Sequence, residues 1–212
     1  MSSYLLTLLI FIPLLSGLIL LALPERFSHL VKSVALAISL LSLALSALIW
    51  YLIPAKAGFH LVEKYTWIPF LGIDYHLGID GISLFLVLLS TVFTAIAMLY
   101  AWQSIQEKSG RFYALLLVLE AGLLGTVLAQ NLFLFYIFWE LMLLPMFFLI
   151  GIWGGANRIR AVVKFVIYTM TGSLILLLSI LYLGVQFQSY TGKWSFDLSV
   201  LSQLPLPNSP IV

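Results

Sequence analysis

Two groups that can exchange a proton lie in the most apolar part of this chain. Glu140 is the only charged residue between Ala121 and Asn157, and Lys164 follows 24 residues later, near the start of the next apolar run. A carboxylate or an ammonium group inside a bilayer is costly, and such residues usually mark proton or ion pathways. The pair therefore points to proton transfer within a membrane.

Glu120 is a third ionisable residue in an apolar run, the one from Phe112 to Ala129. By itself, a glutamate about eight residues from a helix end could extend its carboxylate to the membrane surface. Together with Glu140 and Lys164, it places ionisable groups on three consecutive predicted helices. We expect all three to take part in proton transfer.

The elements that must hold these residues are membrane helices. Hydrophobic residues make up 63% of the 212 residues, charged residues make up 8%, and the mean hydropathy is +1.14. A membrane crossing needs about 20 apolar residues. Six windows meet this requirement: 5–23, 34–53, 82–105, 112–129, 132–153 and 161–186. The sequence predicts an all-α fold, a polytopic bundle of six transmembrane helices in a single membrane domain covering 1–212.

The basic residues predict how this bundle is oriented. Lys and Arg collect in the short loops after the first, third and fifth helices, which is typical of the cytoplasmic side. The longer segments, a connector at 54–81 and a tail at 189–212, then lie outside with both termini. The first apolar run has no preceding basic residue and no small-residue cleavage site, so we interpret it as a retained helix.

Two residues beside the predicted helices have structural interpretations. Pro145 has no N–H to bond the carbonyl of Leu141, so we expect a helix break and a freed acceptor next to Glu140. The alternative is that Pro145 only bends the helix. Asp80 immediately precedes the third apolar window, where an Asp most simply caps a helix.

Contact between Glu140 and Lys164 depends on their depth in the membrane. If the chain turns at Gly154 and Gly155, Glu140 lies about 21 Å and Lys164 about 13 Å from that turn. A lysine stem and one water can cover the difference of roughly 8 Å, so we expect a switchable contact. The alternative is a static ion pair that fixes the register of two helices.

Composition also excludes several kinds of site. The chain has no Cys, which excludes disulfides, thiolate zinc sites and cysteine-ligated iron–sulfur clusters. Its three His residues lie at or beyond the predicted helix ends, which argues against a bis-His haem in the membrane. We expect no cofactor or metal on this chain, and the net charge of +2 does not suggest a nucleic-acid partner.

Three stretches of the sequence resemble one family. They are 77–84 (LGIDGISL), 133–155 (FLFYIFWELMLLPMFFLIGIWGG) and 164–173 (KFVIYTMTGS). All three resemble subunit M of bacterial NADH-quinone oxidoreductase, respiratory complex I, whose mitochondrial, chloroplast and cyanobacterial counterparts are called chain 4. The pattern WELMxxPM is specific to this subunit over its L and N relatives. The resemblance extends over nearly the whole chain and matches the first six of the family's fourteen helices.

The resemblance implies a role for each ionisable residue. The family's glutamates on helices 5 and 4 correspond to Glu140 and Glu120, and its helix-6 lysine corresponds to Lys164. In the family these groups belong to a chain of protonatable residues through which quinone reduction elsewhere drives proton translocation. The helix-5 glutamate usually pairs with a lysine on helix 7, which would make Lys164 a secondary partner. Position 131 is Asn where relatives often have Asp, which removes a charge from the expected outer surface.

The implied assembly is a redox-driven complex in an energy-transducing membrane, such as the bacterial inner membrane. Its partners would be L-like and N-like membrane subunits and lipid, with flavin, iron–sulfur clusters and quinone bound by other subunits. Two alternatives are a subunit of a related multisubunit cation/proton antiporter or membrane-bound hydrogenase, and a non-transporting membrane scaffold.

Overall fold

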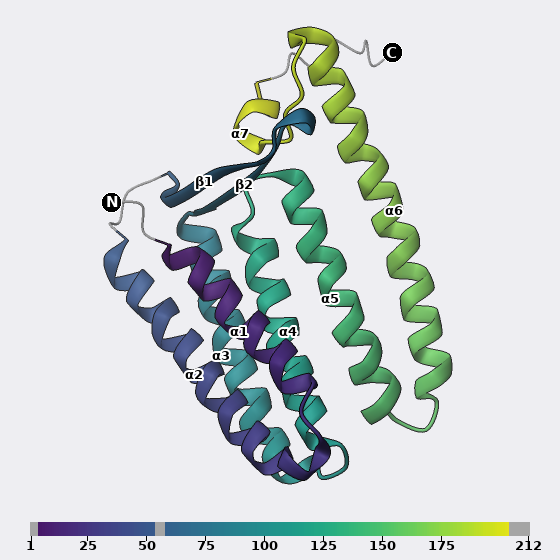
Figure 1. The fold of residues 1–212 in the computed structure, drawn as a ribbon. Helices are drawn as coiled ribbons and strands as arrows, with labels where there is room; N and C mark the ends of the chain where they lie inside the picture. The colour runs from purple at the N-terminus through teal and green to yellow at the C-terminus, as the bar shows by residue number, and fades with distance from the viewer. Residues whose placement is uncertain (1–3, 54–57, 204–212) are drawn as a thin grey trace.

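The computed structural model describes residues 4–53 and 58–203, and six antiparallel apolar helices make up most of it (Figure 1). They are α1 (Leu5–Leu21), α2 (Ser28–Leu52), α3 (Gly81–Ser104), α4 (Ser109–Leu128), α5 (Leu132–Trp153) and α6 (Arg158–Thr191). Five are long and apolar enough to cross a membrane, and α1 is a shorter apolar helix of 17 residues. The predicted helical membrane bundle is confirmed.

The helix ends differ from the apolar windows where polar residues continue a helix. The helix α5 has the predicted bounds, whereas α6 begins at Arg158 and ends at Thr191, beyond the predicted 161–186. An apolar window marks only the part of a helix suited to the bilayer, and the backbone can stay helical past it. Gly192 then ends α6 with a left-handed backbone at φ +72°. The first residues of the predicted tail, 189–191, are therefore helical.

The connector between α2 and α3 contains a β-hairpin, which the all-α prediction did not include. Strand β1 (His60–Ile68) pairs antiparallel with β2 (Ile73–Ile79), with Tyr65 opposite Tyr75. Aromatic and β-branched residues favour such pairing. The turn between the strands is a short 3-10 helix, η2 (Pro69–Leu71). The part of the connector at 54–57 lies outside the described residues.

Gly72 allows the hairpin turn to meet the segment that follows α6. Its backbone is left-handed, with φ +63°, and a Cβ atom at this position would lie 2.1 Å from the carbonyl oxygen of Trp194. The short helix α7 (Leu198–Leu201) follows this contact. In Figure 1 the hairpin and α7 lie together at one end of the bundle, above the start of α5. Residues 204–212 of the predicted tail lie outside the described residues.

The helix α4 is the centre of the bundle, because it packs against α1, α2, α3 and α5. Glycines permit the closest approaches: a Cβ on Gly17 would lie 2.8 Å from Val118, and one on Gly125 would lie 2.3 Å from the Phe138 ring. By contrast, α6 packs mainly along α5 and exposes most of its other sides (Figure 1). The three candidate proton-transfer residues therefore occupy helices with very different degrees of burial.

Asp80 caps α3, as the sequence suggests. Its Oδ1 accepts a hydrogen bond of 2.8 Å from the backbone N–H of Ser83, and the Ser83 hydroxyl accepts one of 2.8 Å from the N–H of Asp80. This reciprocal capping box satisfies backbone donors at the start of the helix. The Ser83 hydroxyl also donates to Asp80 Oδ1 at 2.5 Å. This bond and the one from the Ser83 N–H lower the pKa of Asp80, because both stabilise its carboxylate.

Candidate functional site

Glu140 lies halfway along α5 and lines an apolar groove of about 370 Å³ between α5 and α6. Val166 and Met170 supply the α6 side of this groove. The carboxyl group interacts with the side chain of Tyr136, one turn earlier, which also interacts with Ser173 of α6. Oε1 of Glu140 is buried without a hydrogen-bond partner among the described residues. An acceptor in this position is poised to gain a further partner.

The helix α5 is continuous through Pro145, so the expected helix break is wrong. Pro145 is buried within α5, which the structure assigns from Leu132 to Trp153 without interruption. A proline removes one hydrogen bond at its own nitrogen, and the remaining bonds of the helix hold the backbone on both sides. The effect of Pro145 beside Glu140 is local.

Lys164 does not contact Glu140 in the part of the chain that the structure describes. It is exposed near the start of α6 and forms none of the ion pairs there. Its neighbour Val166, two residues later, faces the groove of Glu140. Two residues on an α-helix are rotated by about 200°, so Lys164 lies on nearly the opposite side of α6.

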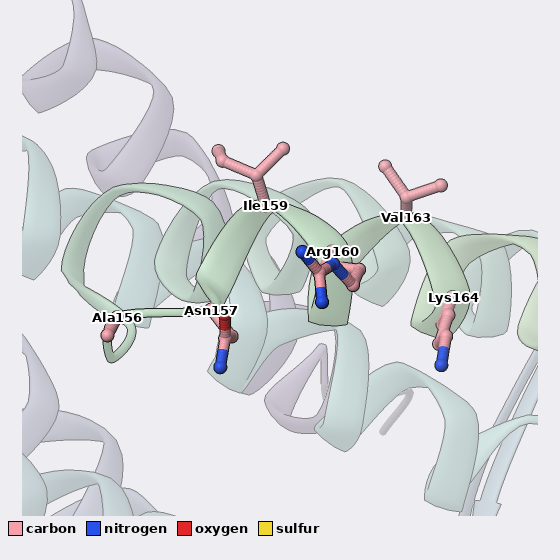
Figure 2. A pocket seen from close by; sticks show the side chains of 6 residues that line it. All are labelled: Ala156, Asn157, Ile159, Arg160, Val163 and Lys164. Atoms are coloured by element: carbon pink, nitrogen blue, oxygen red, sulfur yellow. The ribbon is translucent and has the colours of Figure 1, made fainter.

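Lys164 lines an open depression of about 580 Å³ at the beginning of α6. Figure 2 shows Asn157 and Lys164 extending to one side of the helix and Ile159 and Val163 to the other. Arg160, one turn before Lys164, adds a second cation to this depression. The expected pair is thus separated into a carboxylate in one groove and a cationic site on another face.

Glu120 is the most enclosed of the three ionisable residues. Its exposed fraction is 0%, and neither carboxyl oxygen has a hydrogen-bond partner among the described residues. Because α4 is surrounded by four helices, this carboxyl cannot extend to the membrane surface. Extension of Glu120 to the membrane surface is therefore excluded. A buried carboxyl group of this kind needs either to be protonated or to have a polar or charged partner.

Sequence reasoning missed a charged cluster where the hairpin meets the start of α5. Asp197, whose side chain is 1% exposed, forms an ion pair with Lys64, and its Oδ1 lies 3.2 Å from Nδ1 of His76. Asn131 donates from Nδ2 to the same oxygen of Asp197 at 3.2 Å. Lys64 also lies 3.2 Å from Asp74. These residues come from four separated parts of the chain, so their spacing gives no signal.

Asp197 is strongly stabilised as a carboxylate by this cluster. Burial by itself would raise its pKa, but the interactions with His76, Lys64 and Asn131 outweigh burial and lower the pKa to about 2. The hydrogen bond to Asp197 likewise raises the pKa of Lys64. The cluster therefore holds opposite charges together at neutral pH.

Asn131 is a structural centre of this cluster, at the end of the bundle that carries the hairpin. It is fully buried, and its Oδ1 accepts hydrogen bonds from the backbone N–H groups of Phe133 and Leu134, capping α5. Its amide also donates a hydrogen bond to Asp197. An aspartate at position 131 would instead place a second negative charge next to Asp197. An asparagine at this position can donate a hydrogen bond to the Asp197 carboxylate, which an aspartate cannot do when ionised.

Glu63 of the hairpin caps α1 from a distant part of the chain. Its carboxylate accepts hydrogen bonds from the N–H groups of Leu6 and Thr7, at 2.9 and 3.1 Å, and from the Thr7 hydroxyl at 2.5 Å. Negative charge is favourable at a helix N-terminus. Glu63 and the Asp197 cluster together fix the hairpin across the ends of α1 and α5.

Among the described residues, no group of three or more metal-ligating side chains is suited to hold a metal ion.

Comparisons with known proteins identify the relatives of this arrangement. Residues 129–204 match the family described as NADH:quinone oxidoreductase/Mrp antiporter, TM. The chain is 39% identical over 208 residues to NAD(P)H-quinone oxidoreductase chain 4 2 of Thermosynechococcus vestitus, covering 97% of this chain and 38% of that protein. It is 38% identical over 195 residues to NADH-quinone oxidoreductase subunit M of Escherichia coli, covering 86% of this chain and 38% of that protein.

A solved structure supports the same relationship. The fold matches a chain in the respiratory complex I of Thermus thermophilus with bound NADH, with a TM-score of 0.78 and 28% identity, covering 95% of this chain and 39% of that chain. This chain thus spans well under half the length of the proteins that it matches. It is an integral membrane protein that belongs to the subunit M and chain 4 family of NADH-quinone oxidoreductase, respiratory complex I.

Proposed function

We propose that this chain is part of a proton-translocating membrane-arm subunit of a redox-driven quinone oxidoreductase, with Glu140 in the proton path. The observation that carries the proposal is the place of Glu140. Its carboxyl group lies in an apolar groove, with Oε1 buried and unpartnered among the described residues. Such a group, held by an intact helix, can gain or lose a nearby cation without refolding.

The energetics of such a site are adequate for pumping. Moving one proton against about 150 mV costs about 3.5 kcal/mol, which corresponds to a pKa change of about 2.5. Desolvation of a buried group changes its pKa by up to about 3 to 5, and a nearby opposite charge changes it by about 1 to 3. A lysine that approaches and leaves Glu140 can therefore change the pKa values of the pair by enough to take up and release one proton, and the redox reaction elsewhere in the complex would supply the free energy.

The position of Lys164 favours a lysine other than Lys164 as the main partner of Glu140. Lys164 lies on another side of α6, next to Arg160, where the two cations suit a role in attracting or passing protons near one membrane surface. Most of the α6 surface away from α5 is exposed and apolar. We propose that further helices of the subunit cover this surface and bring the partner lysine to the groove.

The proposed setting follows the relatives. The neighbours would be L-like and N-like membrane subunits and lipid, and other subunits would carry the flavin, iron–sulfur clusters and quinone. The hairpin, the segment after α6 and both termini would face the outer side of a bacterial inner membrane or an equivalent energy-transducing membrane. This chain would itself carry out no redox chemistry.

Replacing Glu140 in the assembled complex tests the proposal. Glu140→Gln keeps the shape of the side chain and removes its charge, so we expect normal assembly on native gels and a loss of quinone-driven proton uptake. Glu140→Asp retains the charge and should pump better than the Gln variant. Glu107→Gln, at an exposed position between α3 and α4, is the matched control and should pump normally.

Other outcomes favour the other candidate functions. Wild-type pumping by an assembled Glu140→Gln complex would remove Glu140 from the mechanism and favour the scaffold. The matching family also includes Mrp antiporters. Purification of the native complex without flavin or iron–sulfur subunits, together with cation/proton exchange that needs no quinone, would favour an antiporter.

A further inference from the structure

The interior between α2, α3 and α4 contains a line of buried polar side chains. On α2, Ser39, Ser42 and Ser46 all have an exposed fraction of 0%, and on α3 Thr91 and Thr94 are 0% and 9% exposed. A helix pair in a membrane can pack through small residues, and alanine would serve that purpose without a polar group. The hydroxyl groups therefore call for another explanation.

Some of these hydroxyls are satisfied within the protein. Ser46 and Thr91 share a hydrogen bond of 3.0 Å between α2 and α3, and Thr94 donates to the carbonyl oxygen of Ser90 at 2.9 Å. Ser39 and Ser42 differ, because their Oγ atoms are buried without a hydrogen-bond partner among the described residues. The region thus contains unpartnered polar atoms in two consecutive turns of α2.

Glu120 lies at the same depth as Ser39. The hydroxyl groups of Ser28 and Ser109, the first residues of α2 and α4, share a hydrogen bond of 2.6 Å, which aligns the starts of the two helices. Ser39 is 11 residues after Ser28, and Glu120 is 11 residues after Ser109. Both therefore lie about 16 Å along their helices from the same end of the bundle.

Glu120 also faces the same part of the interior. Tyr113 is seven residues before Glu120, so the two share one face of α4. The Tyr113 hydroxyl donates to the carbonyl oxygen of Met98 on α3 at 2.8 Å, and Nζ of Lys32 on α2 lies 5.9 Å from its ring centre. The face of α4 that carries Glu120 is therefore directed at α2 and α3.

We propose that water molecules bind in this polar seam, formed by Ser39, Ser42 and Glu120, and connect it towards Lys32. Four of the six buried side-chain atoms without a hydrogen-bond partner in the described residues are Ser39 Oγ, Ser42 Oγ and the two carboxyl oxygens of Glu120. Leaving such atoms unpaired is costly. A buried water commonly makes about three hydrogen bonds to groups of this kind.

Lys32 marks the end of the seam at which α2 and α4 begin. Its side chain is on the buried face of α2, where Nζ donates to the carbonyl oxygen of Ile105 at 3.2 Å and lies 5.9 Å from the ring centre of Trp102. The hydroxyls of Ser39 and Ser42 then continue the polar surface deeper into the bundle. Lys32, Ser39 and Ser42 are spaced by one or two helical turns, and one or two water molecules can bridge gaps of this size.

If the proposed function holds, this seam supplies protons to Glu120. A water beside the carboxylate donates a proton to it and takes one from the next water, so that no water is consumed and one proton moves inward. Serine hydroxyls can donate and accept at once, which suits them to hold such a chain. The water sites themselves do not depend on transport by the complex.

High-resolution electron cryo-microscopy of the complete complex tests the inference. We expect density for ordered water within hydrogen-bond distance of Ser39 Oγ, Ser42 Oγ and at least one oxygen of Glu120. The double variant Ser39→Ala/Ser42→Ala should assemble and lose the water peaks next to those positions. Ser33→Ala removes an exposed hydroxyl of the same helix, which bonds to the carbonyl oxygen of His29, and should leave the seam unchanged.

Proton uptake gives a second measurement. The double variant should slow uptake by about 2- to 10-fold, the effect of losing one or two hydrogen bonds along the path, whereas Ser33→Ala should not. A dry seam in which Glu120 bonds directly to protein groups would overturn the inference. Water in the seam of a complex that transports no protons would leave the water site standing and remove only the proposed function.

Discussion

Asp197 offers the most direct test of how the hairpin and the segment after α6 are held to the membrane helices. Folding lowers the pKa of its carboxyl group from 3.8 to about 2, and a difference of this size corresponds to about 2 kcal/mol of stability at neutral pH. Asp197→Asn keeps the shape of the side chain but removes the charge that pairs with Lys64. We expect the variant to lose on the order of 2 kcal/mol.

The pH dependence has a definite sign. Because the pKa of Asp197 is lower in the folded protein, its contribution is complete above pH 3.8 and disappears as the pH falls through about 2. The stability difference between wild type and Asp197→Asn should therefore be largest near neutral pH. Roughly half of it should remain at pH 3.

Denaturant unfolding of the full-length subunit in detergent, followed by tryptophan fluorescence at several pH values, measures this difference. The matched control is Asp74→Asn, which removes the more exposed partner of Lys64 and should cost less than about 1 kcal/mol. Equal stability of wild type and Asp197→Asn at pH 7 would refute the reasoning. So would a difference that grows as the pH is lowered.

Three further predictions concern other parts of the structure. Glu63→Gln should destabilise the protein by about 1 to 3 kcal/mol in the same unfolding assay, because it removes the charge from hydrogen bonds that cap α1; an unchanged midpoint would contradict the capping role. Asn131→Asp should retain the α5 cap yet place two carboxylates together, so its stability should fall as the pH rises above about 4, and no pH-dependent loss would argue against the contact with Asp197. Single cysteines at the exposed positions Ser104 and Lys193 should label from opposite sides, Lys193 from outside, and outside labelling of Ser104 alone would reverse the orientation.

The membrane helices and the candidate proton-transfer residues could be predicted from local patterns in the sequence. Apolar windows located six helices, since burial in lipid requires about 20 apolar residues in one run. Rare charges in those windows singled out Glu120, Glu140 and Lys164, because each is costly enough to require a reason. The cap at Asp80 was also readable, since its hydrogen bonds join residues three apart. These signals are all local in the chain.

Which of these groups meet depends on how the helices and the hairpin pack together. Helix rotation turned Lys164 away from the groove of Glu140, and packing around α4 enclosed Glu120 inside the bundle. The cluster of Asp197 and the cap supplied by Glu63 join residues 66 and 57 positions apart in the chain. Such contacts depend on how the helices and the hairpin pack in three dimensions. A hydropathy pattern predicts where helices and strands lie, but it does not predict which distant side chains come into contact.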